Sequence, residues 1–403
     1  MVGPVDTDNW LTIIGLGEDG PDGLSPASRA ALDAAEIIMG AARHLELVPE
    51  ISAEKRVWPV PFADGVPELM GLRGRRVVVL ASGDPFWFGA GSVLARELEA
   101  HEWRAIPTPS AFSLAAARLG WPLEAVLVRG LHAAPFERLR PDLAPGRRLI
   151  VTLRDGDAVK GLAEWLAETG FGDSTLHLME ALGGPRERVR TCQAKNCTLD
   201  DVQHPVVAAV DVAGQGAVVH CAGGQADDLF DHDGQITKRP LRAMTLSALA
   251  PKPGELLWDV GAGSGSIALE WLMADPSTEA VALEARADRA TRIRANANAL
   301  GQDRLQIVQG RAPEALAGLP APQAVFVGGG LSAATLSRLE TNLPLGTRLV
   351  VNAVTLETEA LLVEAAARLG GTLTKIEMAE AKPLGRFRGW KAAYPLVQWS
   401  VSL

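Results

Sequence analysis

The chain is poor in cysteine. Its 403 residues include only Cys192, Cys197 and Cys221, and this odd number at these spacings fits neither a set of paired disulfides nor a zinc ribbon. The seven histidines are scattered along the sequence. We therefore expect reduced, unligated thiols and no metal site.

Long apolar runs and an excess of positive charge are also missing. No apolar run reaches the length that spans a membrane, and the chain does not start with the basic and then apolar pattern of a signal peptide. Acidic residues outnumber basic ones by 48 to 39, which gives a net charge of -9, whereas nucleic-acid binding needs a basic surface. These features predict a cytoplasmic protein with a small-molecule partner and with neither a membrane nor a nucleic-acid partner.

Hydrophobic residues make up 47% of the chain, and a chain of this length can form two domains, each with its own core. The glycine- and acid-rich stretch Ala222–Lys238 is the best candidate for a linker, so we place the domains at 1–225 and 226–403. The pattern predicts an α/β fold, with two small lobes in the N-terminal half and a parallel sheet covered on both faces in the C-terminal half. The C-terminal half is expected to contain strands at Leu256–Val260, Val281–Glu284, Leu305–Val308, Ala324–Val327 and Arg348–Asn352, helices at 332–343 and 356–369, and a closing strand or hairpin at Trp390–Val401.

A glycine-rich loop follows a short apolar strand in the C-terminal half. It reads Gly261-x-Gly263-x-Gly265, whereas a dinucleotide-binding turn has its third glycine one position later, where this chain has Ser266. Such a loop lets the backbone approach a ligand closely, and the helix that follows offers free N–H groups. Glu284 ends the next strand, where a carboxylate can accept hydrogen bonds from two ribose hydroxyls. The spacing favours S-adenosylmethionine over NAD.

The N-terminal half has a second glycine-rich loop. Gly15-x-Gly17-x-x-Gly20 satisfies the NAD fingerprint, but Pro21 and Gly23 follow where a phosphate-binding helix would begin. Two tight turns come later, ASGDPF at 81–86 and PSAFS at 109–113. Each motif alone is compatible with an ordinary loop.

The C-terminal half resembles the Rossmann-like, seven-stranded S-adenosylmethionine-dependent methyltransferases. Beyond the glycine loop and its acid, ITKRPLRAMTLSAL at 236–249, RAPEAL at 311–316 and AVFVGGG at 324–330 are similar to cobalamin-pathway methyltransferases that act on carbon 15 of a precorrin and remove the acetate carboxyl at carbon 12. Arg311 stands where that family usually has aspartate. The resemblance implies that the cofactor is surrounded by Thr237, Gly261, Ala262, Gly263, Ser264, Gly265, Glu284 and Ala312.

The N-terminal half resembles the two-lobed tetrapyrrole methyltransferases, including the member that methylates carbon 5 in the same pathway. Four motifs in order carry this likeness: GLGEDGPDGLSPAS at 15–28, ASGDPF, PSAFS, and LMEALGGPRERV at 178–189. Glu18 and Asp19 replace the Pro-Gly pair that is commoner in the family. The resemblance implies a cofactor folded between the lobes and bound by Gly15, Gly17, Ser82, Gly83, Asp84, Ser110 and Ala111.

In this order the two halves resemble the fused precorrin-6 5,15-methyltransferase (decarboxylating) family of cobalamin biosynthesis. That resemblance implies a bifunctional enzyme that uses S-adenosylmethionine to methylate carbons 5 and 15, decarboxylates the carbon-12 acetate to give precorrin-8, and forms a homo-oligomer. Methyl transfer to a ring carbon chiefly requires alignment of the reactants, so we assign no catalytic residue.

The implied substrate carries several carboxylates, with which guanidinium groups pair well. We therefore expect substrate contacts from Lys238, Arg239, Arg242, Arg386 and Arg388, while Arg186, Arg188 and Arg190 could serve the N-terminal half. Two alternatives stay open. One is an NAD-dependent oxidoreductase that uses the N-terminal glycines, and the other is one catalytic methyltransferase half fused to a cofactor-sensing half.

Overall fold

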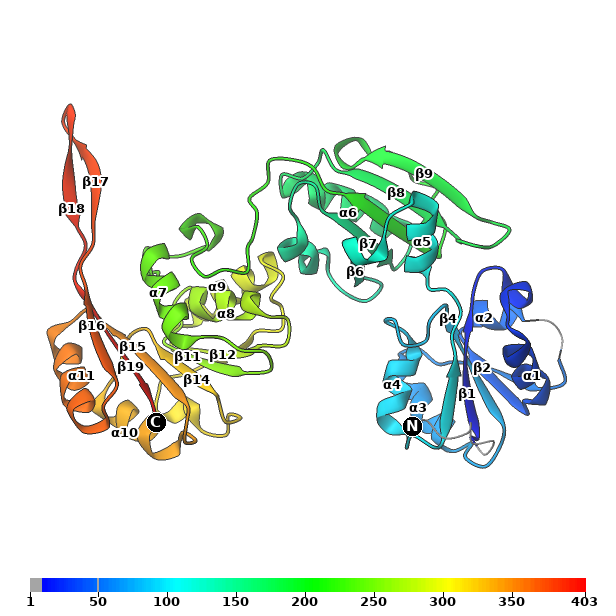
Figure 1. Ribbon diagram of the computed structural model, residues 1–403, viewed down its shortest axis with the longest axis horizontal. Coiled ribbons are helices and arrows are strands. Elements are labelled where there is room, and N and C mark those ends of the chain that lie inside the picture. Colours follow the sequence, from blue (N-terminus) through cyan, green and yellow to red (C-terminus); the bar gives the residue numbers. More distant parts are fainter. Residues whose placement is uncertain (1–8, 49–50) are drawn as a thin grey trace. The chain divides into compact units, whose positions relative to one another are not determined.

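The computed structural model describes residues 9–48 and 51–403, and the chain divides into two compact units. Unit 1 comprises the chain up to Phe136 together with Asp142–Ala217, and unit 2 comprises Glu137–Pro141 and Val218–Leu403. In Figure 1 the colours of unit 1 run from blue to green and those of unit 2 from green to red. The chain thus passes from one unit to the other ahead of the position expected near residue 225.

The first lobe of unit 1 is a parallel five-stranded sheet in the order β3-β2-β4-β1-β5. Strand β1 is buried along its whole length because successive side chains point to opposite faces and both faces are covered: Ile13 packs with α3 and α4, and Ile14 with α1 and α2. The elements are β1 (Leu11–Leu16), β2 (Ile37–Gly40), β3 (Glu54–Val57), β4 (Val77–Ser82), β5 (Trp103–Ile106), α1 (Pro26–Ala34), α2 (Ala42–Leu47), α3 (Gly65–Met70) and α4 (Ala90–Glu97).

The second lobe of unit 1 is a mixed five-stranded sheet in the order β6-β7-β10-β8-β9, in which only the β6–β7 pair is parallel. Helix α5 packs on this sheet through Phe112 and Ala116, which lie in one cluster with Ile150 and Met179. The elements are β6 (Leu127–Gly130), β7 (Arg148–Leu153), β8 (Thr175–Glu180), β9 (Arg188–Gln193), β10 (Val206–Asp211), α5 (Ala111–Leu119) and α6 (Asp157–Glu168). The two α/β lobes expected for the N-terminal half are confirmed.

Unit 2 is a seven-stranded sheet in the order β13-β12-β11-β14-β15-β19-β16, with helices on both faces. The first five strands in this order are parallel, and β19 runs antiparallel to both of its neighbours. This arrangement confirms the Rossmann-like, seven-stranded fold that the sequence predicts. The elements are β11 (Leu256–Val260), β12 (Glu279–Glu284), β13 (Gln306–Gln309), β14 (Ala324–Val327), β15 (Arg348–Ala353), β16 (Thr372–Ile376), β19 (Leu396–Ser402), α7 (Arg239–Leu249), α8 (Ser266–Ala274), α9 (Ala287–Ala299), α10 (Ala333–Asn342) and α11 (Leu356–Leu369).

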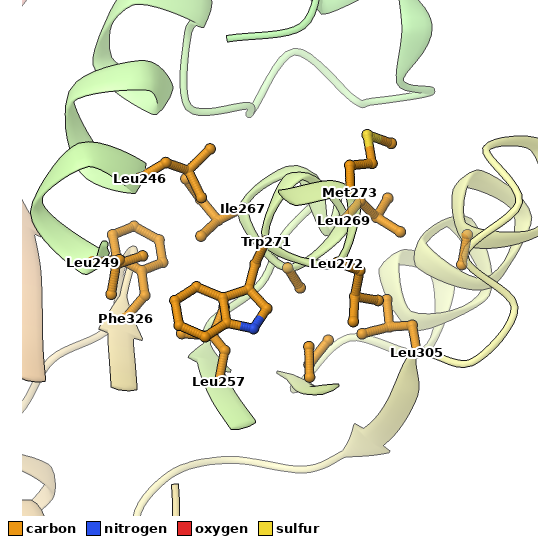
Figure 2. Packing of buried hydrophobic residues seen from close by; sticks show 14 of the residues in the cluster. Leu246, Leu249, Leu257, Ile267, Leu269, Trp271, Leu272, Met273, Leu305 and Phe326 are labelled. Carbon is orange, nitrogen blue, oxygen red and sulfur yellow. The ribbon is translucent and has the colours of Figure 1, made fainter. Parts of the chain in front are cut away.

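Helix α8 is the most deeply buried helix on its face of unit 2, since every residue from Ser266 to Met273 is buried. Trp271 lies at the centre of the cluster shown in Figure 2, close to Leu257 of β11 and Phe326 of β14. Its indole N–H donates to the carbonyl of Glu279 at 3.0 Å. The helix that follows the glycine loop is therefore fixed against the sheet. None of the helices in the described part of the chain is long and apolar enough to cross a membrane.

The closing strand expected in Trp390–Val401 is confirmed for Leu396–Val401, which lies in β19 (Leu396–Ser402), and the rest of the expectation is corrected. This stretch spans parts of two separate elements, the end of β18 (Phe387–Ala392) and most of β19. Strand β18 pairs with β17 (Ala379–Leu384) in a two-stranded ribbon that projects from unit 2 in Figure 1, while β19 lies inside the main sheet. The pattern was misleading because the ribbon buries neither face, so its residues carry no hydrophobic period.

The stretch Ala222–Lys238 is not a free linker either. Phe230 and Gln225 are almost fully buried, and Phe230 belongs to the core cluster of unit 2. The backbone N–H groups of Gly224 and Gln225 donate to the Glu270 carboxylate of α8. Its content of glycine and aspartate is typical of an exposed linker. In the structure this stretch packs against α8 instead.

The expectation of reduced thiols is wrong for two of the three cysteines. Cys192 and Cys197 form a disulfide, with their Cα atoms 5.4 Å apart. The short turn Ala194–Asn196 after β9 folds the chain back on itself and brings the two side chains together. Cys221 is a free, exposed thiol.

Candidate functional site

Unit 1 contains a cavity of about 690 Å³ that both of its lobes line. The first lobe contributes the chain after β1 and β4, including Gly17, Ser82, Gly83 and Asp84. The second lobe contributes side chains of its sheet, such as Met179 of β8. This volume is typical of a pocket for a small organic ligand.

Six of the seven residues predicted to bind a cofactor in unit 1 line this cavity: Gly17, Ser82, Gly83, Asp84, Ser110 and Ala111. The side chains of three of them already have partners. Ser110 caps α5 by accepting from Ser113 N at 3.1 Å, Asp84 accepts from Phe86 N at 2.9 Å, and Ser82 Oγ accepts from Arg43 Nη2 at 3.1 Å. Backbone groups are therefore the main contacts these loops offer to a ligand.

Gly15, the seventh predicted residue, lies within β1 and is not among the residues that line the cavity. A Cβ atom at Gly15 would fall 1.8 Å from the carbonyl oxygen of Gly83. That oxygen also accepts hydrogen bonds from the backbone N–H and the hydroxyl of Thr108, both at 3.2 Å. Glycine is needed here because three segments meet without room for a side chain, so Gly15 shapes the site through packing.

The chain after the first glycine loop does not form the helix that an NAD site requires. Gly20–Gly23 is a single turn of 3-10 helix with Pro21 near its start. In a dinucleotide-binding unit the pyrophosphate meets the N-terminus of a full α-helix at this point. The geometry therefore argues against the NAD-dependent alternative.

The candidate site of unit 2 lies at the carboxyl ends of the parallel strands, where α/β sheets bind ligands. Gly261, Gly263 and Gly265 follow β11, and all three have positive φ angles, of 74°, 61° and 77°. A Cβ at Gly261 would lie 2.7 Å from the oxygen of Gly329, and one at Gly265 would lie 2.8 Å from the side chain of Ile293. Both backbone angle and space thus require glycine.

Glu284 ends the neighbouring strand β12 and points its carboxylate at this loop. One carboxylate oxygen accepts from Gly263 N and the other from Arg286 N, both at 2.9 Å. The side chain is only 5% exposed. The acid is therefore held in one orientation beside the glycine loop, as the spacing predicts.

Asp259 is a residue of this site that the sequence analysis missed. It lies at the end of β11 and is 1% exposed; one carboxylate oxygen accepts from Ala268 N at 3.1 Å, and the other has no hydrogen-bond partner within the described part of the chain. Burial raises the pKa of Asp259 to about 7, and the charge of Glu284 adds to this effect, while the Ala268 N–H opposes it. Its position in the strand that leads into the glycine loop, separated from Gly261 by Val260, was the available signal.

Thr237 and Ala312 lie on segments that approach the same edge. The Cβ position of Gly263 is 3.9 Å from the carbonyl of Gln235, which places the segment before α7 beside the loop. Ala312 follows β13, the strand paired with β12 at Glu284. Both are partly buried.

The structure corrects the expectation for Arg242. It was expected to bind substrate, but its side chain is fully buried in unit 2. Its guanidinium donates to the carboxylates of Glu270 and Asp227 and to the carbonyls of Thr237 and Gln225. The donors that a substrate would need are already used to hold the segment before α7, so Arg242 has a structural role.

The other four predicted substrate contacts are exposed. Lys238 and Arg239 lie at the start of α7, and Lys238 is within 3.7 Å of the Asp227 carboxylate. Arg386 and Arg388 lie on the projecting ribbon. The ribbon and Lys238 are close enough that Lys238, after the nearer Lys382, helps to lower the pKa of Glu380 in β17. Among residues 9–48 and 51–403, no cluster of histidine, cysteine or acidic side chains could hold a metal ion.

Taken together, a two-lobed unit with a cavity and a seven-stranded unit with a glycine loop and an acid define a chain of two α/β units, each with a candidate ligand-binding site. Residues 10–197 match the family model described as Tetrapyrrole (Corrin/Porphyrin) Methylases, and residues 228–403 match the Precorrin methyltransferase domain.

A curated relative from Sinorhizobium, named Precorrin-6Y C(5,15)-methyltransferase [decarboxylating], is 48% identical over 402 residues, which is 98% of this chain and 97% of the relative. The Cobalt-precorrin-7 C(5)-methyltransferase of Salmonella typhimurium is 26% identical and covers 49% of this chain and 97% of its own length. The solved C-terminal domain of precorrin-6Y C5,15-methyltransferase from Rhodobacter capsulatus is 52% identical, over 46% of this chain and 100% of that one, with a TM-score of 0.45. The chain belongs to the family of decarboxylating precorrin-6Y C(5,15)-methyltransferases.

Proposed function

We propose that the chain uses S-adenosylmethionine to methylate carbons 5 and 15 of precorrin-6Y and to release the carbon-12 acetate carboxyl as carbon dioxide, which gives precorrin-8. The observation that carries this proposal is the likeness to the Sinorhizobium relative over nearly the full length of both chains. That relative's name includes both methylations and the decarboxylation. A candidate ligand-binding site in each of the two units also favours two reactions over one.

The proposed division of labour gives carbon 5 to unit 1 and carbon 15, with the decarboxylation, to unit 2. Unit 1 carries the match to the tetrapyrrole methylases. A relative named for carbon-5 methylation alone matches 49% of the chain, so that activity exists in a protein about as long as one unit.

The residues of unit 2 fit S-adenosylmethionine as the proposed cofactor. The backbone of the glycine loop can come close to a ligand because its glycines carry no side chains, and Glu284 offers two carboxylate oxygens to ribose hydroxyls. The unpartnered, buried oxygen of Asp259 suits the ammonium group of a methionine moiety. A nearby positive charge would also favour the ionised form of this acid, whose pKa is raised to about 7.

The cofactor supplies an electrophilic methyl group on a sulfonium leaving group. The protein's task is to hold the ring carbon, the methyl carbon and the sulfur in line and to exclude water, which is catalysis by proximity and orientation. For the decarboxylation, the bond between the acetate methylene and its carboxylate breaks, carbon dioxide leaves and the electron pair passes into the conjugated ring. A proton from water then adds to the methylene carbon and completes a methyl group at carbon 12. Because the substrate accepts these electrons itself, the step needs no electron acceptor from unit 2.

The experiment that tests the function incubates the full-length chain with precorrin-6Y and S-adenosylmethionine and reads the product by mass spectrometry. The expected product has gained two methyl groups and lost one carbon dioxide. Calorimetric titration with the cofactor is expected to give two sites per chain. One site per chain would favour the alternative of a catalytic half fused to a cofactor-sensing half, and a product that changes only by hydride transfer would contradict the proposal.

We also propose that the chain forms a homo-oligomer through the β17–β18 ribbon. Phe387 and Trp390 are 79% and 80% exposed there, an unusual exposure for large apolar side chains. Trp390→Glu is expected to lower the molar mass measured by light scattering to that of a smaller assembly. Lys391→Glu, at the next exposed position, should leave it unchanged, and equal molar masses for wild type and Trp390→Glu would exclude the ribbon as the interface.

A further inference from the structure

Glu18 is a departure from the tetrapyrrole methylase pattern, and the structure gives its side chain two partners. It lies in the first glycine loop of unit 1, lines the cavity and is only 8% exposed. Its carboxylate accepts from the guanidinium of Arg43, and its second oxygen accepts from Arg186 Nη2 at 3.2 Å. Arg43 belongs to α2 of the first lobe, and Arg186 follows β8 of the second. Glu18 therefore joins cationic groups from both lobes at one corner of the cavity.

This corner keeps a positive potential although Glu18 is present. Two guanidinium groups face one carboxylate, which leaves one positive charge unbalanced. The positive charge affects two neighbouring histidines. Burial is the main cause that lowers the pKa of His44 to about 4 and also lowers the pKa of His204. The charge of Arg43 is the second cause in both cases and lowers the pKa further. An additional anion at this corner is thus electrostatically favoured.

The two arginines differ in how much of their hydrogen-bonding capacity remains. Arg43 is largely committed, because Nη2 also lies 2.9 Å from His44 Nε2 and 3.1 Å from Ser82 Oγ. Arg186 is 54% exposed, and within the described chain Glu18 is the acceptor that its guanidinium contacts. It therefore keeps N–H donors that are exposed and can meet a ligand beside Glu18.

The neighbouring arginines of the same segment use several of their N–H donors within unit 1. Arg188 and Arg190 both donate to the carboxylates of Glu180 and Asp201. Of the three arginines that the sequence suggested for the N-terminal half, Arg186 is the one that contacts the cavity-lining Glu18. Arg43 contacts Ser82, which belongs to the loop proposed to hold the methyl donor. This corner of the cavity therefore lies beside that loop.

We propose that Arg186 and Arg43, held in position by Glu18, form a binding site for a carboxylate of the tetrapyrrole substrate in unit 1. Arg186 donates directly to the carboxylate, while Arg43 supplies the second positive charge next to Ser82. Guanidinium–carboxylate hydrogen bonds are charge-assisted and strong, so this contact contributes to the affinity of unit 1 for the ring. The inference rests on the proposed carbon-5 methylation, because the substrate is identified by its acetate and propionate groups.

The test compares Arg186→Gln with wild type in the full-length chain, following carbon-5 methylation at varied precorrin concentration. The KM for the precorrin is expected to rise about 10-fold or more, as for the loss of a charge-assisted hydrogen bond, whereas kcat changes by less than about 2-fold and the dissociation constant for S-adenosylmethionine is unchanged. Arg186→Lys should bind the precorrin more tightly than Arg186→Gln but less tightly than wild type, since lysine keeps the positive charge but lacks the paired N–H donors of the guanidinium.

Arg76→Gln is the matched control, because Arg76 is an exposed arginine of the same unit that lies near Glu36 on the surface. Carbon-15 methylation in the same samples reports the amount of folded chain. An unchanged KM in Arg186→Gln, or a loss of S-adenosylmethionine affinity as large as the loss of precorrin affinity, would overturn the assignment. A wild-type chain that adds no methyl group at carbon 5 would instead overturn the proposed function on which the assignment rests.

Discussion

Replacing Glu284 with alanine is expected to abolish methylation at carbon 15 and the release of carbon dioxide, while carbon 5 is still methylated. The carboxylate is buried beside the glycine loop and is the acceptor proposed for two ribose hydroxyls. Each hydrogen bond to a charged group contributes about 1.5–3 kcal/mol, so losing two weakens cofactor binding in unit 2 by roughly 100-fold to 10,000-fold. Product mass and carbon dioxide release measure the two outcomes.

Glu279→Ala is the matched control for this change. Glu279 begins the same strand β12, but its side chain is exposed and lies at the far end from the glycine loop. Both activities are expected to persist in that variant. Unchanged carbon dioxide release in Glu284→Ala would contradict the ribose assignment, and loss of both activities together would indicate a general folding defect.

Replacing Gly15 with alanine is expected to give the opposite result: loss of carbon-5 methylation with carbon-15 methylation retained. The added Cβ would lie 1.8 Å from the Gly83 oxygen, so the loops after β1 and β4 must separate. Overpacking of this kind costs about 1–3 kcal/mol of folding free energy. A displacement of about 1 Å in a site that works by alignment lowers the rate on the order of 100-fold.

Gly71→Ala controls for the loss of a glycine in the same lobe. Gly71 has an ordinary φ of -67°, and its nearest neighbour would be 3.3 Å from the new Cβ. Thermal unfolding and carbon-5 methylation should match wild type in this variant. Full carbon-5 activity in Gly15→Ala would show that the close packing of the two loops does not shape the site.

The fold was predictable where local pattern and burial agree. The bounds expected for Leu256–Val260 and Ala324–Val327 coincide with β11 and β14 because both are short apolar runs that loops interrupt sharply. The same reasoning failed for the β17–β18 ribbon, which has no buried face. It also failed for Ala222–Lys238, since composition does not reveal that Phe230 and Gln225 reach the core of unit 2.

The candidate sites likewise contain some residues that could be predicted from the sequence and others that could not. The glycine loop and Glu284 were predictable because their spacing along the chain determines their neighbourhood at the sheet edge. Arg242 was assigned wrongly because a basic residue near a proposed cofactor loop is compatible both with substrate binding and with a buried ion pair, and its partner Glu270 is 28 positions away. The contact between Glu18 and Arg186 spans 168 positions, so only the folded chain reveals it.

The packing of the stretch before α7 has a practical consequence for studying unit 2 alone. A shortened polypeptide that begins at residue 226 would lack Val219, which belongs to the core cluster, and the two N–H groups that Gly224 and Gln225 donate to Glu270. In that fragment the buried Glu270 carboxylate would keep its ion pair with Arg242 but lose two hydrogen-bond donors. The free-energy cost of removing this carboxylate from water would then be only partly offset. A fragment starting at or before Val218 keeps this network whole and is the better choice for expression.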